Sequence, residues 1–150
     1  MNDYPRQDKK IKLYLTDNSQ ITGLINIAGR RIVELVEDAD PDIVMYSVKR
    51  EDGKLHRTVL VTKQQIVWID PLENEIGKPE VGIWQKVSFK LANGQAITGE
   101  VDISGYSRVS DYFQAFSSRF YEVYECNTNG KKQNLLFVSS GHVLWRELVD

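Results

Sequence analysis

The sequence predicts an all-β protein with little helix, built as two tandem five-stranded small barrels related by an internal pseudo-symmetry. Two observations lead to this fold class. The chain of 150 residues contains the same apolar motif twice. Within each copy, apolar and polar residues alternate with a period of two, as half-buried strands require, whereas helices would repeat every 3.6 residues. Closing a small sheet into a barrel would hide strand edges that otherwise favour aggregation.

The duplicated motif is a hairpin. Residues 10–29 read KIKLYLTDNSQITGLINIAG, and residues 86–105 read KVSFKLANGQAITGEVDISG, so the triplet Ile-Thr-Gly that ends at Gly23 recurs, ending at Gly99. Apolar or small residues match throughout these two stretches. After one inserted residue the match continues to the end of each copy, where Trp68 corresponds to Trp145. A shared pattern over this length indicates a tandem duplication.

Each hairpin has the residues that its geometry needs. In the first copy, Ile11, Leu13 and Leu15 give one apolar face of a strand, and the polar residues 16–19 supply the turn. In the second copy the turn is Asn93-Gly94, a pair that tolerates the positive φ of tight hairpins. Gly23 and Gly99 lie in the middle of the second strand of each hairpin, where a missing side chain permits a sharp bend or close backbone approach.

The remaining elements follow from the same alternation. In the first unit we expect strands at 11–15, 21–27, 43–48, 58–62 and 65–69, with a short helix within 30–37. In the second unit we expect strands at 87–91, 97–103, 120–126, 135–139 and 142–146, with a short helix within 108–116. The predicted domains are residues 8–71 and 84–148. They are joined by a linker at 72–83, which contains Gly77, Pro79 and Gly82.

Composition excludes several classes of protein. The formal net charge is −2 and the charges of both signs are interspersed, which argues against a large electrostatic surface for nucleic acid or anionic lipid. The first ten residues are polar, and no apolar run approaches the roughly 20 residues that cross a bilayer. The expected location is the cytoplasm, and the single Cys126 excludes an intrachain disulfide.

The stretch VSFKLANGQAITG, which ends at Gly99, resembles the first motif of Sm-like small barrels, including the bacterial Sm-like RNA chaperone. Residues 62–71, TKQQIVWIDP, are similar to the closing strand of that chaperone. The resemblance implies an Sm-like or SH3-like small barrel in each unit. The Asp and Asn that Sm proteins use for base recognition have no match after Gly29 or Gly105. The run from Arg108 to Asp111 also resembles an uncharacterised bacterial repeat family with an Arg-apolar-Ser-Asp signature.

No pattern in the sequence indicates catalysis or a cofactor. His56 and His142 lie at non-equivalent places in the repeat, and Cys126 in an aromatic strand is interpreted as a small buried side chain. Phosphate-binding glycine loops, nucleophile elbows and paired-cysteine zinc motifs are missing from the chain. We therefore expect a protein that is not an enzyme and binds neither a metal nor another cofactor.

The candidate binding residues are concentrated in the second unit. Trp68 and Trp145 are expected to pack in the core or an interface, although they could also stack on a ligand. An aromatic series present only in the second unit has the same two interpretations, namely packing or a base-stacking platform. It consists of Tyr106, Tyr112, Phe113, Phe116, Phe120, Tyr121 and Tyr124.

The most distinctive polar motif follows the second hairpin. Ser110 is expected to cap a short helix and Asp111 to lie in its first turn. Arg108 is expected to pair with Asp111 or to bond a nearby carbonyl. Whether this motif is structural or a recognition site stays open. The predicted binding residues are Arg108, Ser110, Asp111, Tyr112, Phe116 and Arg119.

The predicted function is a non-enzymatic binding or scaffold module that acts through a protein partner or through self-association into a homo-oligomer. The alternative is a weak Sm-like binder of RNA or single-stranded nucleic acid. Lys131-Lys132 and Lys49-Arg50, expected in hairpin loops, are candidates for contact with phosphate.

Overall fold

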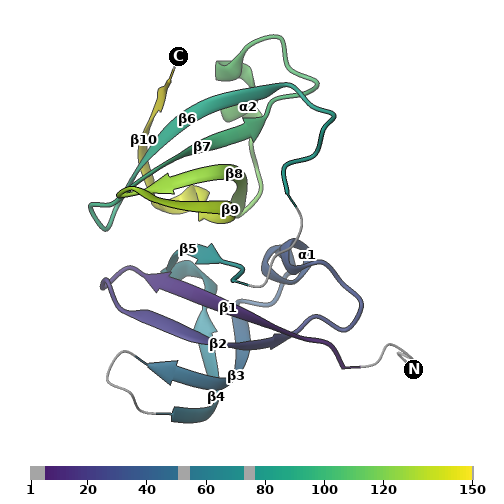
Figure 1. The fold of residues 1–150 in the computed structure, drawn as a ribbon, viewed down its shortest axis with the longest axis vertical. Coiled ribbons are helices and arrows are strands. Elements are labelled where there is room, and N and C mark those ends of the chain that lie inside the picture. Colours follow the sequence, from purple (N-terminus) through teal and green to yellow (C-terminus); the bar gives the residue numbers. More distant parts are fainter. Residues whose placement is uncertain (1–5, 51–54, 73–76, 150) are drawn as a thin grey trace. The chain divides into compact units, whose positions relative to one another are not determined.

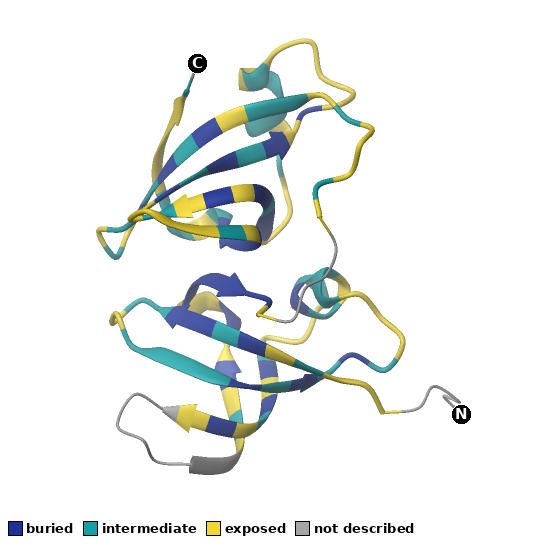
Figure 2. Ribbon diagram, in the orientation of Figure 1, coloured by how far each residue is buried: buried dark blue, intermediate teal, exposed yellow. Residues whose placement is uncertain are grey.

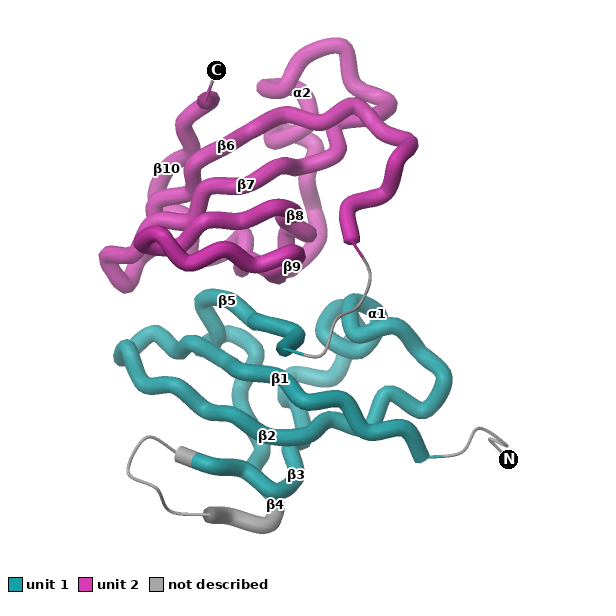
Figure 3. The backbone as a smooth tube through the Cα atoms, viewed as in Figure 1, with its two compact units in different colours: residues 1–73 teal, residues 74–150 magenta. Residues whose placement is uncertain are grey.

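A computed structural model describes residues 6–50, 55–72 and 77–149 of the chain. The chain divides into two compact units, Met1–Glu73 and Asn74–Asp150 (Figure 3). In the part that the structure describes, no helix is long and apolar enough to cross a membrane.

Unit 1 is an antiparallel sheet with the strand order β5-β1-β2-β3-β4 (Figure 1). A short helix connects β2 to β3, and one 3₁₀ turn, η1, connects β4 to β5. The elements are β1 (Asp8–Leu15), β2 (Gln20–Asn26), α1 (Ile32–Glu37), β3 (Asp42–Arg50), β4 (Leu55–Thr62), η1 (Lys63–Gln65) and β5 (Ile66–Asp70).

Unit 2 repeats this arrangement, with the strand order β10-β6-β7-β8-β9. Its helix again lies between the second and third strands. The elements are β6 (Trp84–Leu91), β7 (Ala96–Asp102), α2 (Val109–Ala115), β8 (Phe120–Thr128), β9 (Lys131–Ser139), η2 (Ser140–His142) and β10 (Val143–Leu148). The predicted all-β duplication with little helix is therefore confirmed, and both predicted helices form.

The predicted closure into barrels is not observed. In each unit the fourth and fifth strands lie at opposite ends of the strand order, and no pairing joins β4 to β5 or β9 to β10 among the described residues. The cause is local, because a single 3₁₀ turn separates these strands. After η1 the chain pairs with β1, and after η2 it pairs with β6. Each unit is thus an open five-stranded sheet.

The cores consist of the alternating residues that the sequence pattern marks as inward-facing (Figure 2). In unit 1, Ile11 and Leu13 of β1 are fully buried, and in unit 2 the equivalent residues Val87 and Phe89 are buried in the same way. The two hairpins turn as expected. The Leu15 amide donates to the carbonyl of Ser19, and the Leu91 amide donates to that of Gln95.

The two glycines in the second strands permit a close approach of the third strand. A Cβ added to Gly23 would lie 2.9 Å from the carbonyl oxygen of Tyr46, and one added to Gly99 would lie 2.9 Å from that of Tyr124. Pairing with the third strand shifts register at both glycines. The predicted bend or close approach is therefore a close backbone approach at both sites.

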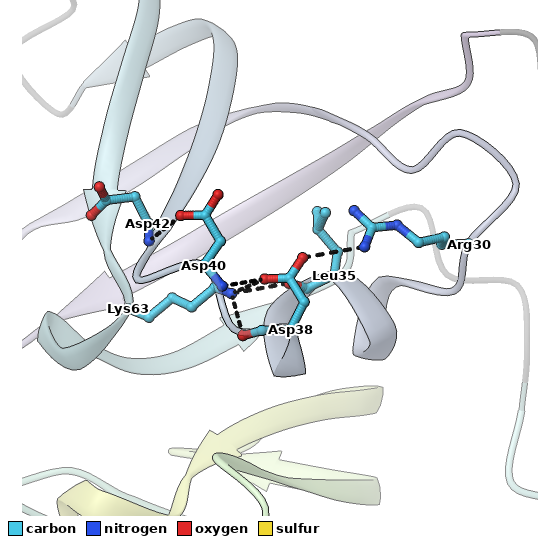
Figure 4. Close-up of polar contacts among 6 residues, drawn as sticks. All are labelled: Arg30, Leu35, Asp38, Asp40, Asp42 and Lys63. Carbon is cyan, nitrogen blue, oxygen red and sulfur yellow. Dashed lines mark hydrogen bonds and ion pairs between the residues drawn. The ribbon is translucent and has the colours of Figure 1, made fainter. Parts of the chain in front are cut away.

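Each 3₁₀ turn is joined to the segment that follows the helix of its unit. In unit 1, the buried Lys63 ammonium donates to the carbonyls of Leu35 and Asp38 at 3.1 and 3.2 Å and to Asp38 Oδ1 at 2.7 Å (Figure 4). In unit 2 the equivalent residue is Ser140, whose hydroxyl donates to the carbonyls of Ser118 and Arg119. Two different side chains thus make the same connection.

Candidate interaction surface

The motif from Arg108 to Asp111 begins helix α2. Arg108 is the N-cap residue, with an extended backbone, and Asp111 lies in the first turn of the helix. The Arg108 guanidinium bonds to the Asp111 carboxylate through Nε and Nη2, both at 3.2 Å. The predicted pair is therefore confirmed. Arg108 remains 75% exposed, so the pair contributes little to stability.

The predicted role of Ser110 is wrong. The helix begins at Val109, one residue before Ser110, and the structure records no side-chain cap hydrogen bond at its N-terminus. Ser110 lies in the first turn and is exposed. The first unit behaves in the same way, because α1 has Arg31 as its N-cap residue and no side-chain cap. Both helices therefore have an arginine with an extended backbone at the N-cap position, and the hydroxyl cap predicted for the second unit is not formed.

We expect the Ser110→Ala substitution to change the free energy of unfolding by no more than about 0.5 kcal/mol, as for an ordinary exposed position. The reason is that no backbone amide loses a hydrogen-bond acceptor. Urea unfolding followed by circular dichroism measures this. A loss of about 1 kcal/mol would show instead that the hydroxyl caps α2 in solution.

The aromatic residues of α2 pack against one another and against β8. Phe116 stacks on Tyr121 with ring centroids 4.0 Å apart, and Tyr112 contacts Phe113 and Phe116 edge-on at 5.1 and 5.8 Å. Phe89 of β6 lies 5.2 Å from Tyr121. We call Phe89, Tyr106, Tyr112, Phe113, Phe116 and Tyr121 the α2 aromatic cluster. Its rings contact each other, which supports the packing interpretation of this series rather than a base-stacking platform.

The cluster is only partly covered. Tyr112, Phe113 and Phe116 are half-buried, and none of the residues of α2 is fully buried. Burial raises the pKa of the Tyr112 and Tyr121 hydroxyls above the ordinary value for tyrosine. Both side chains therefore stay neutral at physiological pH. Arg119, the last predicted binding residue, is exposed, and its carbonyl accepts one of the two bonds from the Ser140 hydroxyl.

Strand β10 forms one edge of unit 2 and exposes three large apolar side chains. Leu144, Trp145 and Leu148 are 62%, 52% and 53% exposed. Between them, Arg146 places its guanidinium 4.7 Å from the ring centroid of Phe113. We call Leu144, Trp145, Arg146 and Leu148 the β10 surface. Arg146 joins one side of the strand to the α2 aromatic cluster, which includes the predicted residues Tyr112 and Phe116. Trp145 lies on the other side of the strand.

The two equivalent tryptophans have different environments. Trp68 is 3% exposed and stacks on Tyr14, its cross-strand partner, with centroids 3.5 Å apart. Trp145 lies opposite Lys90, which occupies the position of Tyr14 in the repeat. Trp68 therefore packs in the core, as expected. Trp145 does not, since a lysine provides no aromatic face on which the indole can stack, and its packing in an interface stays a prediction.

Leu144, Arg146 and Leu148 are not among the binding residues that the sequence predicts. A signal was present, since Leu144 and Leu148 flank the tryptophan in the final strand, where the first unit has Val67 and Pro71.

The prediction that Cys126 is a small buried side chain is confirmed. It is 2% exposed, and its thiol donates to the carbonyl of Val123 at 3.0 Å. The side chain of His56 lies outside the described residues.

Comparison of the chain with protein-family models, with curated proteins and with solved structures finds no match.

Proposed function

We propose that the chain is a non-enzymatic binding module that associates with protein, either a partner or a second copy of itself, through the β10 surface. The observation that carries this proposal is the exposure of Leu144, Trp145 and Leu148 on an edge strand. Trp145 lies on one side of this strand and Leu148 on the other, so the strand exposes large apolar side chains on both sides. Exposed large apolar side chains are typical of interaction sites, and aromatic and arginine residues dominate binding energy at such sites.

The edge of the strand supports the same proposal. Within the described residues β10 pairs with β6 on one side only, so its other side presents backbone amides and carbonyls that an added strand can use. Arg146, held over Phe113, adds a cation beside the apolar residues. An extended segment of a partner would therefore find both backbone hydrogen bonds and side-chain contacts.

We further infer that each unit is an Sm-like small β domain. The support is the strand order with the fifth strand beside the first, the glycine in the second strand and the helix between the second and third strands. The sheets are open rather than closed, so this inference concerns strand order and not barrel closure. The absence of the Sm base-reading residues favours protein over RNA as the partner.

The test is the association state of the whole chain as a function of concentration, measured by sedimentation velocity. We expect wild type to self-associate, and Trp145→Glu to weaken that association about thirtyfold or more, as loss of a central aromatic anchor does. Trp145→Phe, which keeps an apolar ring, should retain most of it. If wild type is monomeric, the same pair of variants is compared in capture of partners from a lysate.

The proposal fails if Trp145→Glu and wild type associate equally and capture the same proteins. The variant is not expected to unfold, because Trp145 is half-exposed and lies on the opposite side of the strand from Arg146, which faces Phe89. Circular dichroism of both variants verifies this before association is compared.

A further inference from the structure

The open edge of β10 presents a defined set of backbone groups. The amide of Val149 donates to the carbonyl of Lys86, so these two residues form a hydrogen-bonded pair between the end of β10 and β6. Residues that bond to the neighbouring strand alternate along an antiparallel ladder with residues that do not. Leu148 and Arg146 therefore direct their amides and carbonyls away from β6. Each offers one donor and one acceptor to a strand added at this edge.

Two charges of opposite sign lie next to each other on the same edge. Arg146 and Glu147 are both exposed, and adjacent residues of a strand point to opposite sides of the sheet. Arg146 lies on the side of Leu148, and Glu147 lies on the side of Trp145. Within the described residues neither charge takes part in an ion pair. Each side of the edge thus carries one charge without a counter-charge beside one exposed apolar side chain.

The same strand of a second copy does not complement these charges. Directly opposite residues of an antiparallel pair point to the same side of the sheet. Pairing β10 with β10 therefore places Arg146 opposite an arginine or an apolar residue, and never opposite Glu147. Like charges directly opposite each other are destabilising. The edge strand β4 of unit 1 contains no carboxylate that could face Arg146. Association of two copies through the side chain of Trp145 does not depend on strand pairing at this edge.

We propose that the edge of β10 takes an extended segment of a different protein with the pattern apolar-basic-acidic-apolar. This proposal rests on the association through the β10 surface proposed above. The segment runs antiparallel to β10, as β6 does, and places its acidic residue opposite Arg146 and its basic residue opposite Glu147. Its apolar residues then lie opposite Leu148 and Trp145. Backbone hydrogen bonds provide the attachment, and the two charges select the partner and its register.

Arg146 is held ready for a carboxylate. Its guanidinium lies 4.7 Å from the centroid of the Phe113 ring. A guanidinium stacks on an aromatic ring through its plane and carries its N–H donors in that plane, in a geometry that matches a carboxylate. The contact with Phe113 therefore leaves these donors for a partner. It also restricts the side chain before binding, which lowers the entropic cost of ordering it in the complex.

Fluorescence anisotropy of two labelled synthetic peptides mixed with the whole chain tests the proposal. The peptides have the same composition and the same serine and threonine flanks, with the central order Leu-Lys-Glu-Leu in one and Leu-Glu-Lys-Leu in the other. We expect the first to bind about tenfold more tightly, because the second places like charges opposite both charges of β10. Raising the salt concentration should reduce this difference.

Exchanging the two charges of β10 gives a matched variant. The double substitution Arg146→Glu and Glu147→Arg leaves the net charge unchanged and should invert the preference between the peptides. Glu80→Arg is the control, since it alters the charge of an exposed residue outside β10, and it should keep the preference of wild type. Circular dichroism verifies that each variant is folded before binding is compared.

Trp145→Glu separates this proposal from the function on which it rests. If this substitution abolishes binding of both peptides while exchanging the charges leaves the preference unchanged, β10 is an interaction site and the charge pattern is wrong. The pattern is also overturned if Leu-Glu-Lys-Leu binds wild type as tightly as Leu-Lys-Glu-Leu, or if neither peptide binds. Dissociation of self-associated chains by the peptide would overturn it as well, because a second copy would then occupy the edge.

Discussion

Replacing Gly99 with alanine is expected to destabilise unit 2 by about 3 kcal/mol, near the upper end of ordinary overpacking. An added Cβ would lie 2.5 Å from a methyl carbon of Val123 and 2.9 Å from the backbone carbonyl oxygen of Tyr124. The side chain of Val123 is fully buried and the Tyr124 carbonyl belongs to the neighbouring strand, so neither can move without disturbing the sheet. The equivalent change at Gly23 should also destabilise unit 1.

Gly77→Ala is the matched control for this experiment. Nothing lies within 4 Å of a Cβ added at Gly77, so this substitution should leave stability unchanged or slightly raised. Urea unfolding monitored by circular dichroism and tryptophan fluorescence compares the variants, with the transitions of the two units fitted separately where they resolve. A loss below about 1 kcal/mol at Gly99 would mean that β7 and β8 separate more easily than the close contact indicates.

Lys63→Met is expected to destabilise unit 1 by about 2–3 kcal/mol. The change keeps most of the apolar stem and removes the ammonium that bonds two backbone carbonyls and the Asp38 carboxylate (Figure 4). The cost is at the lower end for a buried ion pair because Asp38 is 31% exposed, so water can solvate its charge once the lysine is gone. Lys49→Met, at an exposed lysine of β3, should have little effect.

The contribution of Lys63 should also depend on pH. Its hydrogen bond holds the pKa of Asp38 below the ordinary value of 3.8, with smaller contributions from the Asp40 amide and Arg30. Because the pKa is lower in the folded chain, this stabilisation is present above the ordinary value and is lost as pH falls through the folded-state value. The stability difference between wild type and Lys63→Met should therefore be larger at about pH 7 than at about pH 3.

The same measurement has a clear contrary result. A difference that is unchanged at low pH would show that Lys63 acts through the carbonyls of Leu35 and Asp38 alone, without the carboxylate. Asp38→Asn separates the two contributions, since it keeps a hydrogen-bond acceptor and removes the charge. A negligible effect of Lys63→Met at either pH would contradict the role given to the buried ammonium.

Period-two alternation and the repeat predicted most of the secondary structure. All ten strands form near their predicted positions, and the two helices begin after Arg31 and Arg108, which are equivalent in the repeat. Strand and helix positions depend on residues that are close together in the sequence, and the repeat shows the same pattern twice. They can therefore be predicted from the sequence alone. The pairing of Arg108 with Asp111 is predictable for the same reason, since the two residues are three positions apart on one helix.

Features that depend on register were not predictable from the linear pattern. Ser110 is a favourable capping residue, yet the helix begins one position earlier and leaves its hydroxyl without that role. Thr98, Asn127 and Lys132 lie opposite one another in the sheet although they come from three separate strands. Nothing in the sequence distinguishes Lys63 from an ordinary surface lysine. Its role depends on Asp38, which lies between α1 and β3 and contacts it only in the folded chain.

The two tryptophans show most directly what the sequence determines and what depends on the tertiary structure. The sequence by itself determined that Trp68 and Trp145 occupy equivalent positions in equivalent final strands. Only the cross-strand pairing decided that one is buried against Tyr14 and the other exposed beside Lys90. The physical reason is that alternation specifies which side of a strand a residue occupies, whereas its burial depends on which side chain of another strand lies opposite.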